Sequence, residues 1–392
     1  MLTEEEITSW KTAVNQVIDK HKLKFIQLEV TRVCNLKCVH CGSPTENTDI
    51  SSLLTRNEIK GVLEKIAEEI IDPTHFNHLM FVGGEPFSRK DLLDIIGDTY
   101  DIRGKHGEQV YTNTQIQTNG IYLGEHPETL DMLKQIGVTG FGISIDGLEK
   151  THNSFRGRND AFGKTYKAVK EALDRDFSVS VSTVVNQSNV GELPKLSRLV
   201  REELKPNYWR IMLLDPIGRA RLNRDYLLSP EQIQDAIAFI YKEHIAHLKK
   251  AYLKNKGTKI ELGCGGWCGK EIEGMVRPYL WHCIAGISML GIMYDGAIGG
   301  CTNIPRDFLE GNIRKDDITE VWNNKFQRYR EFDWKKTGEC KTCSEWSACD
   351  GGPMHYRLSD GNMIFCLYQI LYQKKDFRDR VTNDVLNTKA GN

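Results

Sequence analysis

Residues 25–41 read FIQLEVTRVCNLKCVHC and decide the fold: an apolar strand runs directly into a loop with three cysteines. The loop has the spacing Cys-x3-Cys-x2-Cys, at Cys34, Cys38 and Cys41. Iron–sulfur clusters are normally held by four cysteines. Three thiolates on one loop could hold a cubane cluster by three of its irons and leave the fourth iron for another ligand. We therefore predict that Cys34, Cys38 and Cys41 are metal ligands and belong to the catalytic centre.

At these residues the sequence resembles the radical S-adenosylmethionine (radical SAM) superfamily. The resemblance implies that the amino and carboxylate groups of S-adenosylmethionine (SAM) ligate the fourth iron. It also implies that one electron from the cluster cleaves SAM to a 5′-deoxyadenosyl radical.

Short apolar runs alternate with amphipathic segments between about residues 24 and 214. Strands are predicted at residues 25–31, 78–82, 114–118, 140–145, 178–185 and 208–214. Helices are predicted at residues 56–71, 90–100, 127–135, 163–175 and 191–203, with a longer one at 229–254. Repeated strand–helix units favour a parallel sheet, and six units are fewer than the eight of a closed TIM barrel. The sequence thus predicts an α/β fold, a partial (β/α)6 TIM-like barrel followed by a small loop-rich iron–sulfur domain.

The composition indicates which binding partners and which cellular compartment to expect. Lys and Arg total 52 against 53 Asp and Glu, so no basic surface is expected for nucleic acid or an anionic membrane. The chain begins MLTEEE, which is acidic where a secretory signal would be basic, and the apolar-leaning stretch at 284–294 is too short to span a bilayer. We therefore expect a cytoplasmic protein. Its eleven cysteines, an odd number, favour metal ligation over disulfides there.

The domain organisation follows from where the cysteines fall. We predict a lead-in helix at 1–23, the partial barrel at 24–225, a bridging helix at 226–260, a cluster-binding domain at 261–372 and a polar, disordered tail at 373–392. Eight cysteines lie between Cys264 and Cys366. Three at the barrel plus two groups of four account for all eleven.

Polar motifs follow the predicted strands, where a parallel sheet presents its functional groups. Gly83-Gly84-Glu85-Pro86 matches the segment that, by the resemblance, holds the amino group of SAM. The resemblance also implies that Arg156 pairs with its carboxylate, and that His40 meets the adenine through its backbone, where the family usually has an aromatic residue. Each motif also has a purely structural alternative. The Gly-Gly-Glu-Pro segment could be an ordinary turn, Arg156 a solvated loop arginine, and the apolar strand residues part of the core. The predicted cofactor-binding set is His40, Gly83, Gly84, Glu85, Pro86, Thr118, Asn119, Ser144, Asp146, Arg156, Asn186, Met212 and Leu214.

The second cysteine field reads Cys-x12-Gly-x4-Cys from Cys283 to Cys301, then Cys-x2-Cys-x5-Cys from Cys340, and finally Cys366. It resembles the SPASM extension of radical enzymes that modify peptides, as does the segment Ile217-Gly218-Arg219-Ala220. That extension carries two auxiliary [4Fe-4S] clusters, which makes three clusters in all. Pro353 stands where the extension usually has the cysteine that closes the first auxiliary cluster.

Two upstream cysteines could fill this gap. The predicted ligands are Cys264, Cys268, Cys283 and Cys301 for the first auxiliary cluster, and Cys340, Cys343, Cys349 and Cys366 for the second. A zinc ion is the alternative at the second site. In another alternative, Cys264 or Cys268 is not a ligand and donates a hydrogen atom, and the first cluster, with three protein ligands, binds substrate.

The leading functional hypothesis is a radical SAM maturase of a ribosomally made peptide that forms an oxidative crosslink, through carbon–carbon or thioether bonds. The auxiliary clusters would take the electron, and a flavodoxin or ferredoxin would be the external donor. Few residues precede the first strand, so leader recognition is expected elsewhere in the chain or in a separate leader-binding protein. Sulfatase-type maturation is disfavoured because Thr302 follows Cys301 where those enzymes have an aspartate. A peptide epimerase and a small-molecule enzyme acting on a tetrapyrrole-like substrate remain alternatives, and a simple electron carrier would not need the Gly-Gly-Glu-Pro motif.

Overall fold

The strands of the protein form one continuous sheet in the computed structural model, which describes residues 2–42, 49–76, 78–252 and 257–372. Within these residues the sheet has ten strands in the order β10-β9-β8-β1-β2-β3-β4-β5-β6-β7. The strands β1 to β6 run parallel and in sequence order. They are β1 (Phe25–Thr31), β2 (His78–Gly83), β3 (Thr114–Thr118), β4 (Gly140–Ser144), β5 (Ser178–Val185) and β6 (Tyr208–Leu213).

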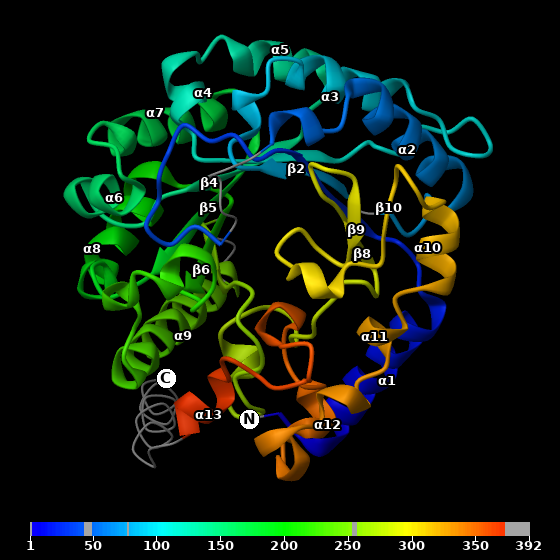
Figure 1. Ribbon diagram of the computed structural model, residues 1–392. Coiled ribbons are helices and arrows are strands. Elements are labelled where there is room, and N and C mark those ends of the chain that lie inside the picture. The colour runs from blue at the N-terminus through cyan, green and yellow to red at the C-terminus, as the bar shows by residue number, and fades with distance from the viewer. Residues whose placement is uncertain (1, 43–48, 77, 253–256, 373–392) are drawn as a thin grey trace.

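Helices cover the outer face of this curved sheet (Figure 1). They are α2 (Arg56–Glu69), α3 (Leu92–Asp101), α4 (Ile121–Glu125), α5 (Thr129–Ile136), α6 (Glu149–Arg156), α7 (Ala161–Asp174), α8 (Leu193–Arg198) and α9 (Pro230–Tyr252). The α2 helix shows why these segments are helical. Thr55 and Glu58 form a capping box at its start, and it buries an apolar face that includes Leu63 and Ile66.

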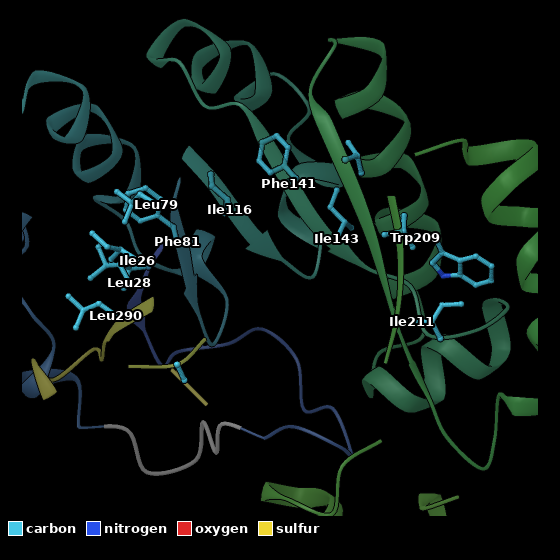
Figure 2. Packing of buried hydrophobic residues seen from close by; sticks show 14 of the residues in the cluster. Ile26, Leu28, Leu79, Phe81, Ile116, Phe141, Ile143, Trp209, Ile211 and Leu290 are labelled. Carbon is cyan, nitrogen blue, oxygen red and sulfur yellow. The ribbon is translucent and has the colours of Figure 1, made fainter. Parts of the chain in front are cut away.

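Side chains along the strands alternate between the apolar core under the helices and the interior of the partial barrel. Ile26 and Leu28 are fully buried and share one apolar cluster with the helix residues and with core residues of neighbouring strands, such as Phe81 (Figure 2). Their neighbours in the strand, Phe25 and Gln27, are only half-buried. Because successive side chains of a strand point to opposite faces, the half-buried set lies on the opposite face, inside the curve.

The six predicted strands and the open barrel are confirmed. The segment predicted as one helix at 191–203 differs: a 3-10 turn (Val190–Glu192), α8 and a π-helical segment (Leu199–Leu204) follow one another. Pro194 lacks a backbone N–H and is tolerated only in the first turn of a helix, so the α-helix begins at Leu193. The short helices α4 and α6 were not predicted.

The region after α9 adds strands to both edges of the sheet. The strand β7 (Lys259–Leu262) pairs with β6, and β8 (Met289–Ile292) pairs in parallel with β1. The strands β9 (Ala297–Gly299) and β10 (Gly311–Asn312) continue antiparallel from β8. Short helices follow, namely α10 (Ile318–Asn324), α11 (Gln327–Arg330), α12 (Trp346–Cys349) and α13 (Leu367–Tyr372).

The N-terminal helix α1 (Glu4–Lys20) packs on this C-terminal region, as Figure 1 shows. Trp10 stacks on Trp267 with ring centroids 5.7 Å apart, and Lys11 forms an ion pair with Asp350. The predicted tail at 373–392 lies outside the described residues. No helix of the described ranges combines the length and the apolar character that crossing a membrane requires.

Candidate functional site

The loop that follows β1 carries Cys34, Cys38 and Cys41. The backbone N–H of Leu36 donates to Cys34 Sγ at 3.4 Å, and Arg156 Nη1 donates to Cys38 Sγ at 3.7 Å. Burial raises the pKa of the Cys34 thiol to about 12. Backbone amides and a guanidinium directed at sulfur are contacts that also stabilise thiolates.

The glycines of the Gly-Gly-Glu-Pro motif fit β2 against this loop. A Cβ on Gly83 would lie 2.5 Å from the carbonyl oxygen of Thr31, and one on Gly84 would lie 2.5 Å from that of Val33. The backbone N–H of Gly84 donates to Thr31 at 2.8 Å, and that of Glu85 donates to Val33 at 2.8 Å. The motif therefore holds the start of the cysteine loop, a role that only residues without a side chain permit at this separation.

The segment Ile217-Gly218-Arg219-Ala220 packs on the other end of the loop. Gly218 has a φ of +53°, and a Cβ there would lie 2.3 Å from the carbonyl oxygen of Cys41. The backbone N–H of Arg219 donates to that oxygen at 2.9 Å, and Asn223 Nδ2 donates to the carbonyl of Val39 at 2.9 Å. The cysteine loop is thus fixed from both sides.

A cavity of about 270 Å³ opens between this loop and the carboxyl ends of the strands. The three cysteines of the loop line it. Nine of the predicted cofactor-binding residues line it as well, namely His40, Gly83, Gly84, Thr118, Asn119, Ser144, Arg156, Met212 and Leu214. Glu85, Pro86, Asp146 and Asn186 do not. The structure therefore brings most of the predicted set together around one hollow.

Glu85 is buried behind the cavity wall. Its Oε1 accepts from Thr118 Oγ1 at 2.7 Å, and its Oε2 accepts from the backbone N–H of Asn119 at 2.8 Å. Burial raises the pKa of Glu85 to about 6, against the opposing effect of these hydrogen bonds. The carboxylate thus ties the end of β2 to the end of β3.

Arg156 lines the cavity while part of its guanidinium is held by Asp146. Its Nε and Nη2 each lie 2.5 Å from Asp146 Oδ2. Asp146 Oδ1 accepts from the backbone N–H of Val184 at 2.8 Å. Burial would raise the pKa of Asp146, but Arg156 and neighbouring groups outweigh it and lower that pKa. Asn186 is also committed to the backbone, because its Nδ2 donates to the Val184 carbonyl at 3.0 Å.

His40 stacks on Phe155, with ring centroids 4.2 Å apart and planes within 1° of parallel. Burial lowers the pKa of His40 to about 3, so the ring is neutral at physiological pH. Its Nδ1 is buried and has no hydrogen-bond partner among the described residues. Buried polar atoms are normally satisfied, so this nitrogen, on a residue that lines the cavity, fits a site that receives a polar ligand.

The cavity is also lined by residues that the predicted set left out, namely Leu36, Gly42, Val82, Gln117, Val184, Leu213, Asp215, Ile217, Arg219 and Asn303. Asp215 is the notable one. It accepts a hydrogen bond from the Tyr356 hydroxyl, and its Oδ2 lies 3.7 Å from His355 Nε2. The signal was present in the sequence, because Asp215 is the first charged residue after the sixth predicted strand.

The cysteines of the second field fall into two neighbourhoods. Burial raises the pKa of Cys349, and the thiols of Cys366, Cys340 and Cys343 add to that rise, so these four side chains are neighbours. Arg357 is buried beside them and donates from Nη2 to Cys340 Sγ at 3.2 Å. This is the predicted second group.

Cys264 has Cys283 and Cys301 as neighbours. Burial raises the pKa of its thiol, and those two thiols, with Asp215, add to the rise. Cys268, the fourth member of the predicted first group, contacts Arg277 and Glu273. Within the described ranges no three Cys, His, Asp or Glu side chains are arranged to share a single metal ion; a zinc ion would need sulfur ligands about 2.3 Å from one centre.

Thr302 occupies the position at which sulfatase-type enzymes have an aspartate. Its backbone N–H and its Oγ1 both lie 3.1 Å from Gln27 Oε1, which accepts from them. Thr302 therefore donates two hydrogen bonds to the side-chain amide of Gln27 in β1. Residue 302 itself carries no carboxylate.

Comparison with known proteins agrees with this geometry. Residues 28–200 match the radical SAM superfamily, and residues 283–344 match SPASM, an iron–sulfur cluster-binding domain. The AdoMet-dependent heme synthase of Methanosarcina barkeri is 26% identical over 367 residues, which cover 88% of this chain and 97% of that protein. The PqqA peptide cyclase of Bradyrhizobium diazoefficiens is 26% identical over 336 residues, 81% of this chain and 78% of the relative.

The fold is also similar to a solved structure of native anSMEcpe with bound AdoMet and Cp18Cys peptide. The TM-score is 0.68 at 17% identity, covering 94% of this chain and 98% of that one. The three-cysteine loop, the partial barrel and the two domain matches lead to one conclusion: the chain is an enzyme of the radical SAM superfamily that carries a SPASM domain after its barrel.

Proposed function

We propose that this enzyme modifies a ribosomally made peptide by net oxidation, forming a carbon–carbon or thioether crosslink. Two similarities support a peptide substrate: the alignment with the PqqA peptide cyclase and the fold shared with anSMEcpe, which was solved with a peptide bound.

The observation that carries the proposal is the size of the cavity. Its volume of about 270 Å³ lies just below the range for small-molecule sites, which run from about 300 to 1,000 Å³. A cofactor the size of SAM would take up most of this space. We infer that the substrate stays largely outside and reaches in with one or two side chains, as an extended peptide does.

Cys34, Cys38 and Cys41 are the proposed ligands of the SAM-binding [4Fe-4S] cluster. Once bound there, the cluster and SAM would supply a 5′-deoxyadenosyl radical, which abstracts hydrogen from an unactivated carbon. The three cysteines fit this role because they lie on one loop that is fixed at both ends and line one cavity.

The remaining cavity residues would position SAM and exclude water. Arg156 is the proposed partner of the SAM carboxylate through Nη1, the nitrogen that does not pair with Asp146. His40 would offer its neutral ring and its backbone to the adenine. Thr118, Asn119 and Ser144 supply small polar groups at strand ends for the ribose and the methionyl moiety, and Met212 and Leu214 supply apolar contacts.

Net oxidation of the substrate requires an electron acceptor. We assign this role to two auxiliary clusters on the cysteines between Cys264 and Cys366. The four neighbouring thiols of the second group, with buried Arg357 beside them, fit an anionic cluster. A flavodoxin or ferredoxin as electron donor, and a separate leader-binding protein, complete the proposed set of partners.

A tetrapyrrole-like substrate is the second candidate. It is favoured by the heme synthase alignment, which spans 97% of the relative. A macrocycle beside SAM would require a cavity larger than the present one, so we rank this candidate below a peptide.

Anaerobic turnover with peptides encoded beside the gene tests the proposal. Reconstituted enzyme, SAM and a reductant should yield 5′-deoxyadenosine and a peptide lighter by two hydrogens, detected by mass spectrometry. Cys34→Ala should abolish both. Unchanged mass of every such peptide, together with turnover of a tetrapyrrole, would replace the proposal with the second candidate.

A further inference from the structure

We propose that a basic surface on the outer side of the cysteine loop, formed by Lys37, Val39, Arg221, Leu222 and Arg224, docks an acidic redox protein. That protein supplies the electron for SAM cleavage. The inference rests on the proposed function in requiring an external one-electron donor. It goes further by naming the surface on which the donor binds and the charge that the donor carries.

The cysteine loop has two sides, and only one of them faces the cavity. Cys38, His40 and Cys41 line the cavity, whereas Lys37 and Val39 do not. The side chain of Lys37 is exposed to solvent. Since SAM and the substrate are proposed to occupy the cavity side, a donor protein has the outer side of the loop for its approach.

The segment at residues 217–228 lies against this outer side. Asn223 Nδ2 donates to the carbonyl oxygen of Val39 at 2.9 Å. Leu222 and Arg224, the two neighbours of Asn223 in the chain, are exposed, and neither lines the cavity. A protein bound at these two side chains would therefore contact the segment that touches the cysteine loop directly.

The surface is basic, although the chain as a whole is nearly neutral. Residues 217–228 contain three arginines and one acidic residue, and the loop residues 33–42 contain Lys37 and no acidic residue. Within the ranges that the structure describes, no ion pair engages Lys37, Arg221 or Arg224. Exposed charges of one sign attract a partner of the opposite sign and speed its association.

Leu222 supplies the apolar centre of this surface. Its exposed fraction is 84%, higher than that of any other large apolar side chain in the described part of the chain. A lone exposed leucine is ordinary on a protein surface. An apolar side chain beside several cations has the make-up of a binding interface, in which an apolar centre lies within a polar rim.

A small acidic protein with a flavin or an iron–sulfur cluster fits this surface. One electron leaves its reduced redox group and enters the cluster on Cys34, Cys38 and Cys41, so that the donor is oxidised by one electron for each SAM cleaved. An acidic peptide substrate is the less suitable occupant, because the basic surface and the cavity lie on different sides of the loop.

The experiment measures binding and electron transfer separately, in the full-length reconstituted enzyme and its variants Arg221→Glu, Leu222→Ser and Arg224→Glu. Lys105→Glu is the matched control, since Lys105 is exposed on the loop before β3, at the opposite end of the parallel strands. An acidic flavodoxin and an acidic ferredoxin are the probes, and surface plasmon resonance measures the affinity of each in its oxidised form. Formation of 5′-deoxyadenosine without peptide is then compared among reduced flavodoxin, reduced ferredoxin and dithionite.

We expect both arginine variants to bind at least one probe about tenfold more weakly at low ionic strength, and to form 5′-deoxyadenosine more slowly with that probe. The difference from the unmodified enzyme should shrink as salt is added, because salt screens exposed charges. Leu222→Ser should weaken binding at every salt concentration. Iron content, dithionite-driven formation and the behaviour of the Lys105 control should stay unchanged.

Equal binding by the arginine variants and the unmodified enzyme would overturn the inference. So would an equal loss with dithionite, which would assign the segment to the support of the cluster loop, or a change confined to peptide turnover. Failure of both probes to bind the unmodified enzyme while dithionite succeeds would overturn it as well. If dithionite itself yields no 5′-deoxyadenosine, the proposed function fails, and the binding measurements still decide the docking surface.

Discussion

At the scale of single residues, Gly84 and Glu85 have structural contacts beyond the SAM contact that their motif predicts. The predicted SAM contact stays a prediction, and Gly84 lines the cavity. Gly84 also packs against the backbone that leads into the cysteine loop, and Glu85 joins two strand ends. A motif gives the identity of its residues and their place at a strand end. It does not say which neighbour each one meets, because that neighbour comes from another strand.

Replacing Gly84 with alanine tests this role. The new Cβ would lie 2.5 Å from the Val33 carbonyl oxygen and 2.6 Å from that of Arg32, so the loop must shift. We expect Gly84→Ala to lose the SAM-binding cluster and 5′-deoxyadenosine formation while the iron of the auxiliary centres remains.

Gly61 provides the matched control. It is exposed within α2 and has nothing within 4 Å of an added Cβ, so Gly61→Ala should keep all clusters and stabilise the protein by about 0.5–1 kcal/mol. Equal iron content in both variants would show that the Gly84 contact does not hold the loop.

Glu85 should make stability depend on pH. Its pKa of about 6 in the folded protein exceeds the ordinary value of 4.5, so the folded state holds its proton more tightly than the unfolded state. The associated stabilisation is complete below about pH 4.5 and is lost as pH rises through about 6, a change of about 2 kcal/mol.

Urea denaturation of the metal-depleted protein across this pH window measures the effect. Glu85→Gln should remove this part of the pH dependence, because glutamine does not titrate. It should also lower stability at every pH, since one of the backbone or hydroxyl donors then faces an amide nitrogen. An identical pH profile in the two proteins would show that Glu85 is not the titrating group.

At the scale of elements, periodicity predicted the barrel strands well because each is an apolar run bounded by turn residues. The strands β7, β8, β9 and β10 were missed for a physical reason. They are two to four residues long, and β8 is stabilised by pairing with β1, more than 250 residues earlier in the chain. Such pairing leaves no local signal. The segment predicted as one helix at 191–203 is divided because Pro194 can stand only in the first turn of a helix, so that α8 begins at Leu193.

The helix α1 is expected to stabilise the C-terminal cysteine region. Trp10 stacks on Trp267, and the next residue pairs with Asp350, which directly follows Cys349. We predict that Trp10→Ala lowers the free energy of unfolding by about 1–3 kcal/mol and speeds iron loss from the auxiliary centres.

Gln16→Ala, on the exposed face of the same helix, should change neither quantity. Thermal denaturation and the rate of iron release to a chelator report both. Iron loss from the SAM-binding centre alone would contradict the assigned role of α1.

At the scale of the whole molecule, the cysteine count predicts three groups. Electrostatic contacts link Cys264 with Cys283 and Cys301, and Cys349 with Cys340, Cys343 and Cys366. Cys268 stays a predicted ligand of the first group. Its contacts with Arg277 and Glu273 could not be foreseen from the cysteine spacing, because those two residues lie further along the chain. Asp215 lines the cavity and is also among the charged neighbours of Cys264. Lys335 is buried. Its charged neighbours include Cys283 and Cys349, one thiol from each predicted auxiliary group.

Lys335 should therefore set the reduction potentials of both auxiliary centres. A buried positive charge favours the reduced, more anionic cluster. Lys335→Met is expected to make both potentials more negative, by an amount on the order of tens of millivolts. Redox titration followed by electron paramagnetic resonance measures the shift, and Lys336→Met, at the exposed neighbouring position, should leave the potentials unchanged. Equal reduction potentials in the two variants would show that the charge of Lys335 does not act on the auxiliary centres.

The most direct test of the central claim is the response of the N-terminal cluster to SAM. In reduced, anaerobically reconstituted protein, adding SAM should change the electron paramagnetic resonance spectrum of the centre on Cys34, Cys38 and Cys41, and 5′-deoxyadenosine should follow. Cys38→Ala should remove both responses. A spectrum that is unchanged by SAM, with no 5′-deoxyadenosine formed, would contradict the account.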